Sequence, residues 1–98
     1  METLKPLSDF FCAIEKDGRI SMTHIAIYAA LLQYRIGKGY INPVQVFSWE
    51  IMRIAKISAA TTYHKCVREL SEYGYITYEP SFKRNKGSRI FFTEGKQT

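Results

Sequence analysis

The sequence predicts an α+β fold in which helices come first and a two-stranded hairpin comes last. Up to Gly74 the apolar residues recur mainly at the spacing of buried helical stripes, and after it they follow the period of strands. A chain of 98 residues, of which 46% are hydrophobic and 14% aromatic, is long enough to form one domain with its own core.

Residues 7–15, LSDFFCAIE, are predicted to form a short N-terminal helix capped by Ser8. Its inward residues would be Phe10, Phe11 and Ile14. We expect residues 1–19 to pack as a segment on a domain formed by residues 20–93, with residues 94–98 as a frayed tail.

The next predicted helix is capped by Ser21 or Thr23 and runs through Arg35. Residues 25–32 make it apolar over most of its circumference, so it should be covered on more than one side. The cover would be either the rest of the domain or a second copy of the chain. We expect this helix to be central to the core and, with the N-terminal segment, a candidate homodimer surface.

A brief strand is predicted at residues 44–47, where Pro43 permits only an edge or an entry point. Ser48 is then expected to cap a short helix that places Glu50 in its first turn. The inward residues of this helix would be Ile51, Ile54 and Ala55.

The following helix is predicted over residues 58–74, with Ser58 as a cap and Gly74 at its end. Its buried stripe would consist of Tyr63, Cys66, Val67, Leu70 and Tyr73. Only Lys56 and Ile57 separate it from the preceding helix, and so tight a connection is typical of a helix-turn-helix.

The opposite face of this helix is small, polar and basic. It carries Ala59, Ala60, Thr61, His64, Lys65 and Arg68. Little bulk and several hydrogen-bond donors suit a helix that enters the major groove of DNA. An ordinary solvated helix face has the same composition, and the context has to decide between the two.

Two strands are predicted after Gly74, at residues 75–79 and 89–93, joined by the loop PSFKRNKGS. The basic side chains of this hairpin are Lys83, Arg84, Lys86 and Arg89. Next to a helix of the kind just described, such a loop suits the phosphate backbone of DNA.

The positive charge of the chain lies in its second half. Residues 1–50 hold five basic and five acidic side chains, whereas residues 51–98 hold nine basic and four acidic ones, which accounts for the net charge of +5. This asymmetry favours a polyanionic partner.

The order helix, strand, helix, helix, strand, strand resembles the winged helix-turn-helix fold over about residues 20–93. The most specific stretch is IAKISAATTYHKCVRELSEYGYI, residues 54–76. The positions that match the family pattern are Ile57, Ser58, Thr62, Leu70, Gly74 and Ile76. Lys56 departs from it, because many relatives have glycine there, and a lysine would strain the turn or add a phosphate contact.

Families with this pattern are bacterial transcription regulators and initiator or excision-type proteins of plasmids and transposons. The resemblance implies that the helix over residues 58–74 reads the major groove and that the hairpin touches the backbone or minor groove. We expect base contacts from Ala59, Ala60, Thr61, His64 and Lys65, and phosphate contacts from Ser58, Arg68, Lys83, Arg84, Lys86 and Arg89.

The sequence shows no pattern typical of an enzyme or of a small-molecule or cofactor site. Its four nitrogen and sulfur ligands, His24, His64, Cys12 and Cys66, match no zinc spacing, so no metal is expected. Both cysteines are interpreted as small core residues. No apolar run approaches the roughly 20 residues of a membrane span, and no secretory signal is recognisable, so a cytoplasmic protein is expected.

We therefore expect sequence-specific binding of double-stranded DNA by a small bacterial regulator or by an accessory protein of a mobile element. The alternative is a winged-helix interaction module, in which the N-terminal segment or the first domain helix docks a larger replication, recombination or transcription protein.

Overall fold

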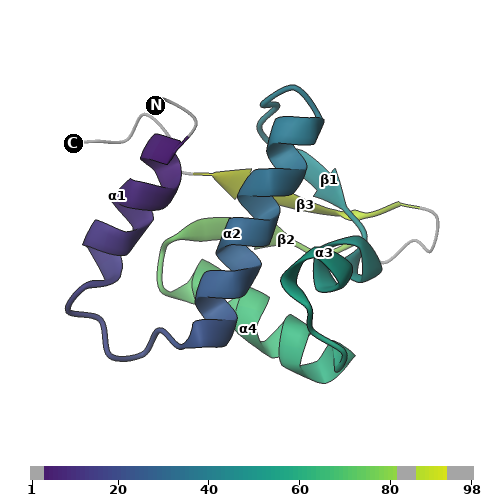
Figure 1. Cartoon of the computed structure of the whole chain (residues 1–98). Helices are drawn as coiled ribbons and strands as arrows, with labels where there is room; N and C mark the ends of the chain where they lie inside the picture. The colour runs from purple at the N-terminus through teal and green to yellow at the C-terminus, as the bar shows by residue number, and fades with distance from the viewer. Residues whose placement is uncertain (1–3, 82–85, 93–98) are drawn as a thin grey trace.

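The computed structural model describes residues 4–81 and 86–92 and has the predicted α+β class (Figure 1). These residues form four helices and one antiparallel sheet of three strands. In chain order the elements are α1 (Lys5–Ile14), α2 (Met22–Gly37), β1 (Val44–Val46), α3 (Ser48–Ala55), α4 (Ala60–Glu72), β2 (Ile76–Glu79) and β3 (Ser88–Phe92).

The sheet has the order β1-β3-β2, so the last strand of the chain lies in the middle. Val44 pairs with Ile90 on one side of β3, and Tyr78 pairs with the same residue on the other. The position of β1 at an edge agrees with the restriction that Pro43 imposes. The strand is one residue shorter than predicted, because Phe47 already stands at the start of α3.

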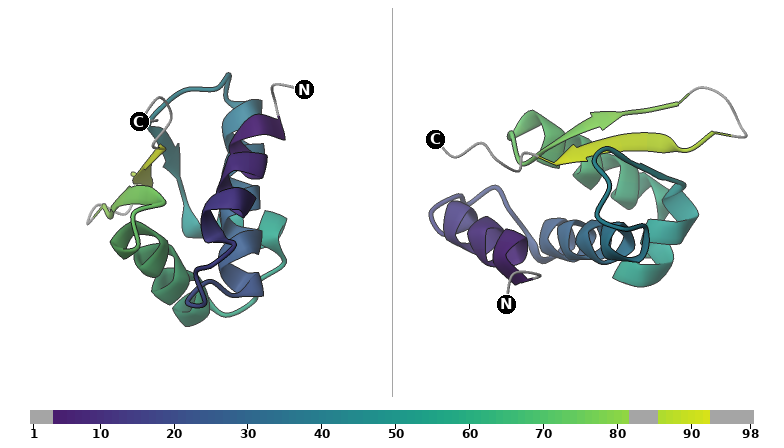
Figure 2. Two further views of the ribbon diagram at one scale, coloured as in Figure 1. Left: turned by 90° about the vertical axis from the view of Figure 1, so that its left-hand side faces the viewer. Right: turned by 90° about the horizontal axis from the view of Figure 1, so that it is seen from above.

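Helix α2 is the centre of the core, as predicted. It lies between α1 and α3 (Figure 1) and also contacts α4. Ile27 and Leu31 are fully buried, and they join an apolar cluster with side chains from α3, α4 and all three strands. Seen from above, the sheet lies along one side of α1 and α2 (Figure 2). The same chain therefore covers much of α2, whereas a homodimer through this helix stays a prediction.

Ser21 caps α2, one of the two predicted possibilities. Its backbone N–H donates to Nδ1 of His24 at 2.9 Å, and its hydroxyl accepts a long hydrogen bond from the backbone N–H of His24. Reciprocal bonds of this kind satisfy two of the backbone groups that every helix start leaves unpaired.

Three predictions for helix α1 are wrong, and two of them fail because the helix packs through one edge only. Phe10 is buried and stacks on Tyr28 with ring centroids 3.9 Å apart, but Phe11 is 47% exposed and not inward. Successive residues of a helix point about 100° apart, so a helix that contacts the core along one line cannot bury both. Cys12 is likewise exposed and not a core residue. Ser8 lies inside α1, which begins after Leu4 without a side-chain cap.

The start of α3 is held by Glu50 and not by Ser48. Phe47 occupies the capping position, and Oε1 of Glu50 accepts its backbone N–H at 3.0 Å. The same carboxylate oxygen accepts the hydroxyl of Tyr34 at 2.9 Å, which ties α3 to α2. Burial and this contact raise the pKa of Tyr34 to about 12. The inward residues of α3 are as predicted, with Ile51 fully buried.

Among the described residues, no helix has both the length and the apolar character needed to cross a bilayer.

Candidate nucleic-acid interface

Helix α4 packs on the core through the apolar stripe that the sequence predicts. Tyr63, Cys66, Val67 and Leu70 are buried, and Tyr73 is half-buried. The helix contacts α2, α3 and β2, so three elements fix its position. Gly74 follows with a φ of +89°, a conformation that glycine adopts without the steric cost that other residues meet. The orientation of α4 is therefore determined by packing along its whole length.

The turn between α3 and α4 contains a lysine in a left-handed conformation. Lys56 has φ and ψ of 64° and 42°, and its backbone N–H donates to the carbonyl of Met52. The backbone N–H of Ile57 donates to the same oxygen at 2.9 Å. The strain predicted as one possibility for a lysine in this turn is thus present at Lys56, because a side chain in the left-handed region clashes with the backbone.

Helix α4 begins two residues later than predicted, and Ser58 does not cap it. Ala59 occupies the capping position in an extended conformation, and its side chain has no acceptor. The residues of the left-handed turn displace the helix start past Ser58, which stays exposed. The first turn of α4 therefore has no side-chain cap.

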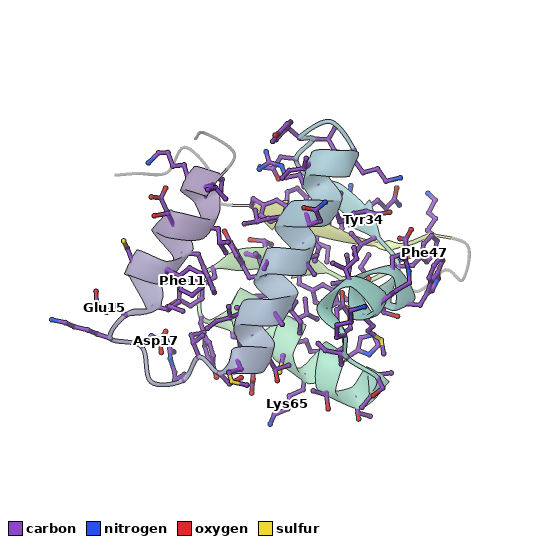
Figure 3. All side chains as sticks on the ribbon, in the orientation of Figure 1. Phe11, Glu15, Asp17, Tyr34, Phe47 and Lys65 are labelled. Carbon is purple, nitrogen blue, oxygen red and sulfur yellow. The ribbon has the colours of Figure 1, made fainter. Side chains whose placement is uncertain are left out.

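The outward face of α4 is open to solvent. Ser58, Ala59, Ala60, Thr61, Lys65 and Arg68 are all exposed. In the part of the chain that the structure describes, neither Lys65 nor Arg68 has an ion pair. The side chain of Lys65 points away from the body of the molecule (Figure 3). This face, which we call the α4 outer face, can meet a partner without first breaking a contact.

His64 differs from the rest of the predicted base-reading set. It is half-buried, and its Nδ1 donates to the backbone carbonyl of Ala60 at 2.9 Å. Because a carbonyl only accepts, this contact places the ring proton on Nδ1. In the neutral imidazole Nε2 is then left as an acceptor. His64 can therefore receive one hydrogen bond from a partner while its orientation is fixed by its own helix.

The basic hairpin is described only in part. Lys83 and Arg84 lie outside the described residues, so their predicted phosphate contacts have no structural account. Lys86 is exposed. Nη2 of Arg89 lies 2.7 Å from Oε1 of Glu79 across the β2–β3 pair. Arg89 is thus engaged within the hairpin, and a phosphate would have to share or displace that contact.

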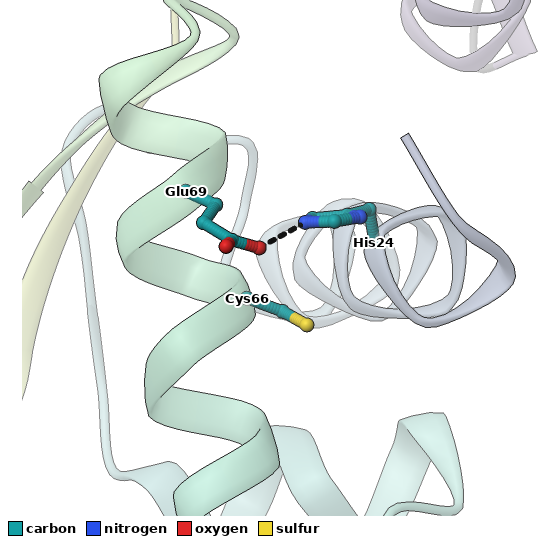
Figure 4. Close-up of side chains that lie close together, drawn as sticks. All are labelled: His24, Cys66 and Glu69. Carbon is teal, nitrogen blue, oxygen red and sulfur yellow. Dashed lines mark hydrogen bonds and ion pairs between the residues drawn. The ribbon is translucent and has the colours of Figure 1, made fainter. Parts of the chain in front are cut away.

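A polar cluster between α2 and α4 is not predicted from the sequence. Nε2 of His24 lies 2.8 Å from Oε1 of Glu69, and Cys66 lies beside this pair (Figure 4). Burial, with a smaller contribution from the Glu69 carboxylate, raises the pKa of the Cys66 thiol. Glu69 stands 45 residues from His24, so no local spacing connects the two. The prediction of no metal site rests on the histidines and cysteines alone, and the carboxylate of Glu69 is a further possible ligand.

Comparison with protein-family models, curated proteins and solved structures found no match for this chain. The described residues combine an exposed, partly basic helix face with a hairpin that carries further cations.

Proposed function

We propose that the protein binds double-stranded DNA as a winged helix-turn-helix, in the manner of a small transcription regulator or an accessory protein of a mobile element. In this proposal α3 and α4 form the helix-turn-helix, and β2, β3 and the loop between them form the wing. The order of the elements and the antiparallel β2–β3 pair support the assignment.

The observation that carries the proposal is the contrast between the two faces of α4. One face is fixed by four buried side chains, and the other exposes small residues at its N-terminal end and cations further along. A helix that enters a groove of DNA needs firm packing on the rest of its own domain and an outer surface without bulky side chains. The open α4 outer face meets the second need.

The contacts divide into two kinds. Thr61, His64 and Lys65 would meet base edges, and Ala59 and Ala60 would approach thymine methyl groups. Phosphate contacts would come from Ser58 and Arg68 on the α4 side and from Lys83, Arg84, Lys86 and Arg89 on the wing. A phosphate at Arg89 would have to share or displace the contact of this residue with Glu79.

Selection of bound duplexes from a random DNA pool tests the proposal. We expect one sequence to be enriched, and a palindrome would indicate a two-fold dimer. With about five phosphate contacts, log affinity should fall against log salt with a slope of about −4 to −5. No enrichment together with a slope near zero would contradict DNA binding.

A second candidate function is docking of another protein. Exposed apolar side chains favour it, because the large apolar anchors of interfaces are often Trp. Trp49 is 62% exposed and stacks on Phe47 with centroids 6.3 Å apart, and Met22 is 83% exposed. This function predicts little retention on immobilised genomic DNA at low salt, together with a protein complex that Trp49→Ala disrupts.

A further inference from the structure

Three different metal-ligating groups meet between α2 and α4. An imidazole nitrogen of His24, Sγ of Cys66 and a carboxylate oxygen of Glu69 all lie within 4.8 Å of one another (Figure 4). His24 and Cys66 are buried, and the side chain of Glu69 is 25% exposed. The cluster is therefore nearly dry but has one side through which an ion can enter.

The spacing of the three atoms is close to that of a metal site. A tetrahedral zinc with bonds of about 2.0 to 2.3 Å places its ligands roughly 3.3 to 3.8 Å apart. The contact of 2.8 Å between Nε2 of His24 and Oε1 of Glu69 would open slightly, and the sulfur would move inward from at most 4.8 Å. The largest of these shifts is about 1 Å.

The sulfur of Cys66 has no role in the hydrogen-bonding of the described residues. If Cys66 served only to fill space in the core, any small apolar side chain could take its place in the α4 stripe. A thiolate, by contrast, is a strong ligand for zinc and similar ions, and binding replaces the thiol proton by the metal. Cys66 lies beside the imidazole of His24 and the carboxylate of Glu69, so its thiolate could bind a metal ion together with them.

His24 can bind a metal through Nε2 after a change of tautomer, because an acceptor for the displaced ring proton lies beside Nδ1. Without metal, Nδ1 accepts the backbone N–H of Ser21, and Nε2–H donates to Glu69. With metal on Nε2, the ring proton would reside on Nδ1 and donate to the hydroxyl of Ser21, which is 2.9 Å away. The exchange leaves the backbone N–H of Ser21 without its acceptor on His24 and gives the Ser21 hydroxyl the Nδ1–H to accept instead.

We propose that His24, Cys66 and Glu69 form a binding site for one zinc-class divalent ion, with solvent as the fourth ligand. Two ligands come from α4 and one from α2, so an ion would clamp the two helices together. The proposal does not depend on DNA binding, because the metal alone is its probe.

Titration of the full chain with Co²⁺ at neutral pH tests the site. We expect one ion per chain, a charge-transfer absorption from thiolate to cobalt, displacement of cobalt by Zn²⁺, and a higher melting temperature with Zn²⁺. Cys66→Ser, His24→Gln and Glu69→Gln should each weaken binding more than tenfold. Matched controls of the same residue types, Cys12→Ser, His64→Gln and Glu72→Gln, should leave binding unchanged.

Glu69→Gln is the most informative variant. Its amide oxygen can still accept the Nε2–H of His24, so the metal-free fold is retained, but it lacks the negative charge that a cation prefers. Circular dichroism without metal checks that each variant is folded. If Cys66→Ser is not folded, Cys66→Ala takes its place. Absence of binding to the unmodified chain, full affinity in Glu69→Gln, or loss of the cobalt band in Cys12→Ser instead of Cys66→Ser would overturn the proposal.

Discussion

Nε2 of His24 lies 2.8 Å from Oε1 of Glu69, so the first turn of α2 is joined to the third turn of α4. His24 is 4% exposed, and its other ring nitrogen is held by Ser21. The helix that presents the exposed cations is thus fixed to the core by a polar link as well as by apolar packing.

Glu69→Ala is expected to destabilise the fold by about 1–3 kcal/mol, because it leaves the buried Nε2–H of His24 without an acceptor. Glu69→Gln, which retains an acceptor, should cost less. Urea unfolding measures both, with Glu72→Ala, an exposed residue of the same helix, as the control. Equal stabilities of the two Glu69 variants would show that the link contributes nothing.

Asp17 should make stability depend on acid pH. Arg19 and the hydroxyl of Tyr75, 2.6 Å away, hold the pKa of Asp17 well below its ordinary value. The charged carboxylate is therefore favoured in the folded state. The contribution of this carboxylate to the free energy of unfolding is complete above the pKa of an unfolded aspartate, about 3.9. It is lost as the pH falls towards the pKa of Asp17 in the folded protein. Asp17→Asn should reduce this acid loss in a pH series of thermal melts, whereas Asp9→Asn on α1 should not.

Lys56→Gly is expected to stabilise the protein by up to about 1 kcal/mol, because glycine relieves the left-handed strain at this turn. Gly74→Ala is the opposite test. The φ of Gly74 is +89°, and an added methyl group meets no atom within 4 Å, so its cost of about 1–2 kcal/mol would come from the backbone alone. Chemical denaturation of both variants checks the pair, and a destabilised Lys56→Gly would show that the lysine side chain makes a contact of its own.

Gly87→Ala should disrupt the pairing of β1 with the start of β3. An added Cβ would stand 2.7 Å from the carbonyl carbon of Val46, a backbone atom of β1 that cannot turn aside. We expect a loss of about 1–3 kcal/mol or more. Gly18→Ala, where a Cβ meets nothing, is the control in the same thermal melts. A melting temperature equal to that of the control would mean that β1 and β3 can separate without cost.

The sequence predicts those parts of the fold that depend on local periodicity. The buried stripe of α4 and the end of this helix just before Gly74 follow from helical spacing and from the turn that glycine permits. Ser48 and Ser58 do not cap helices as predicted, although each stands within one residue of the true capping position. Phe47 and Ala59 are there instead, and no sequence rule favours them.

Contacts between distant parts of the chain could not be predicted. The pairing of β1 with β3, and not with the nearer β2, depends on how the hairpin folds back over the core. The grouping of His24 with Cys66 and Glu69 depends on the packing of α2 against α4. Within the candidate interface, the exposure of Lys65 and Arg68 agrees with the helical pattern, but the contact of His64 with its own helix is visible only in the structure.

Lys65→Ala separates the proposed reading of DNA sequence by the α4 outer face from attraction to phosphate alone. Fluorescence anisotropy would compare the affinity of this variant for the selected site and for random duplex, with Lys83→Ala and the exposed Lys16→Ala as controls. We expect Lys65→Ala to lose about 1–3 kcal/mol on the selected site and clearly less on random DNA, while Lys83→Ala weakens both alike and Lys16→Ala neither. An unchanged ratio of the two affinities in Lys65→Ala would show that the α4 outer face does not read base sequence.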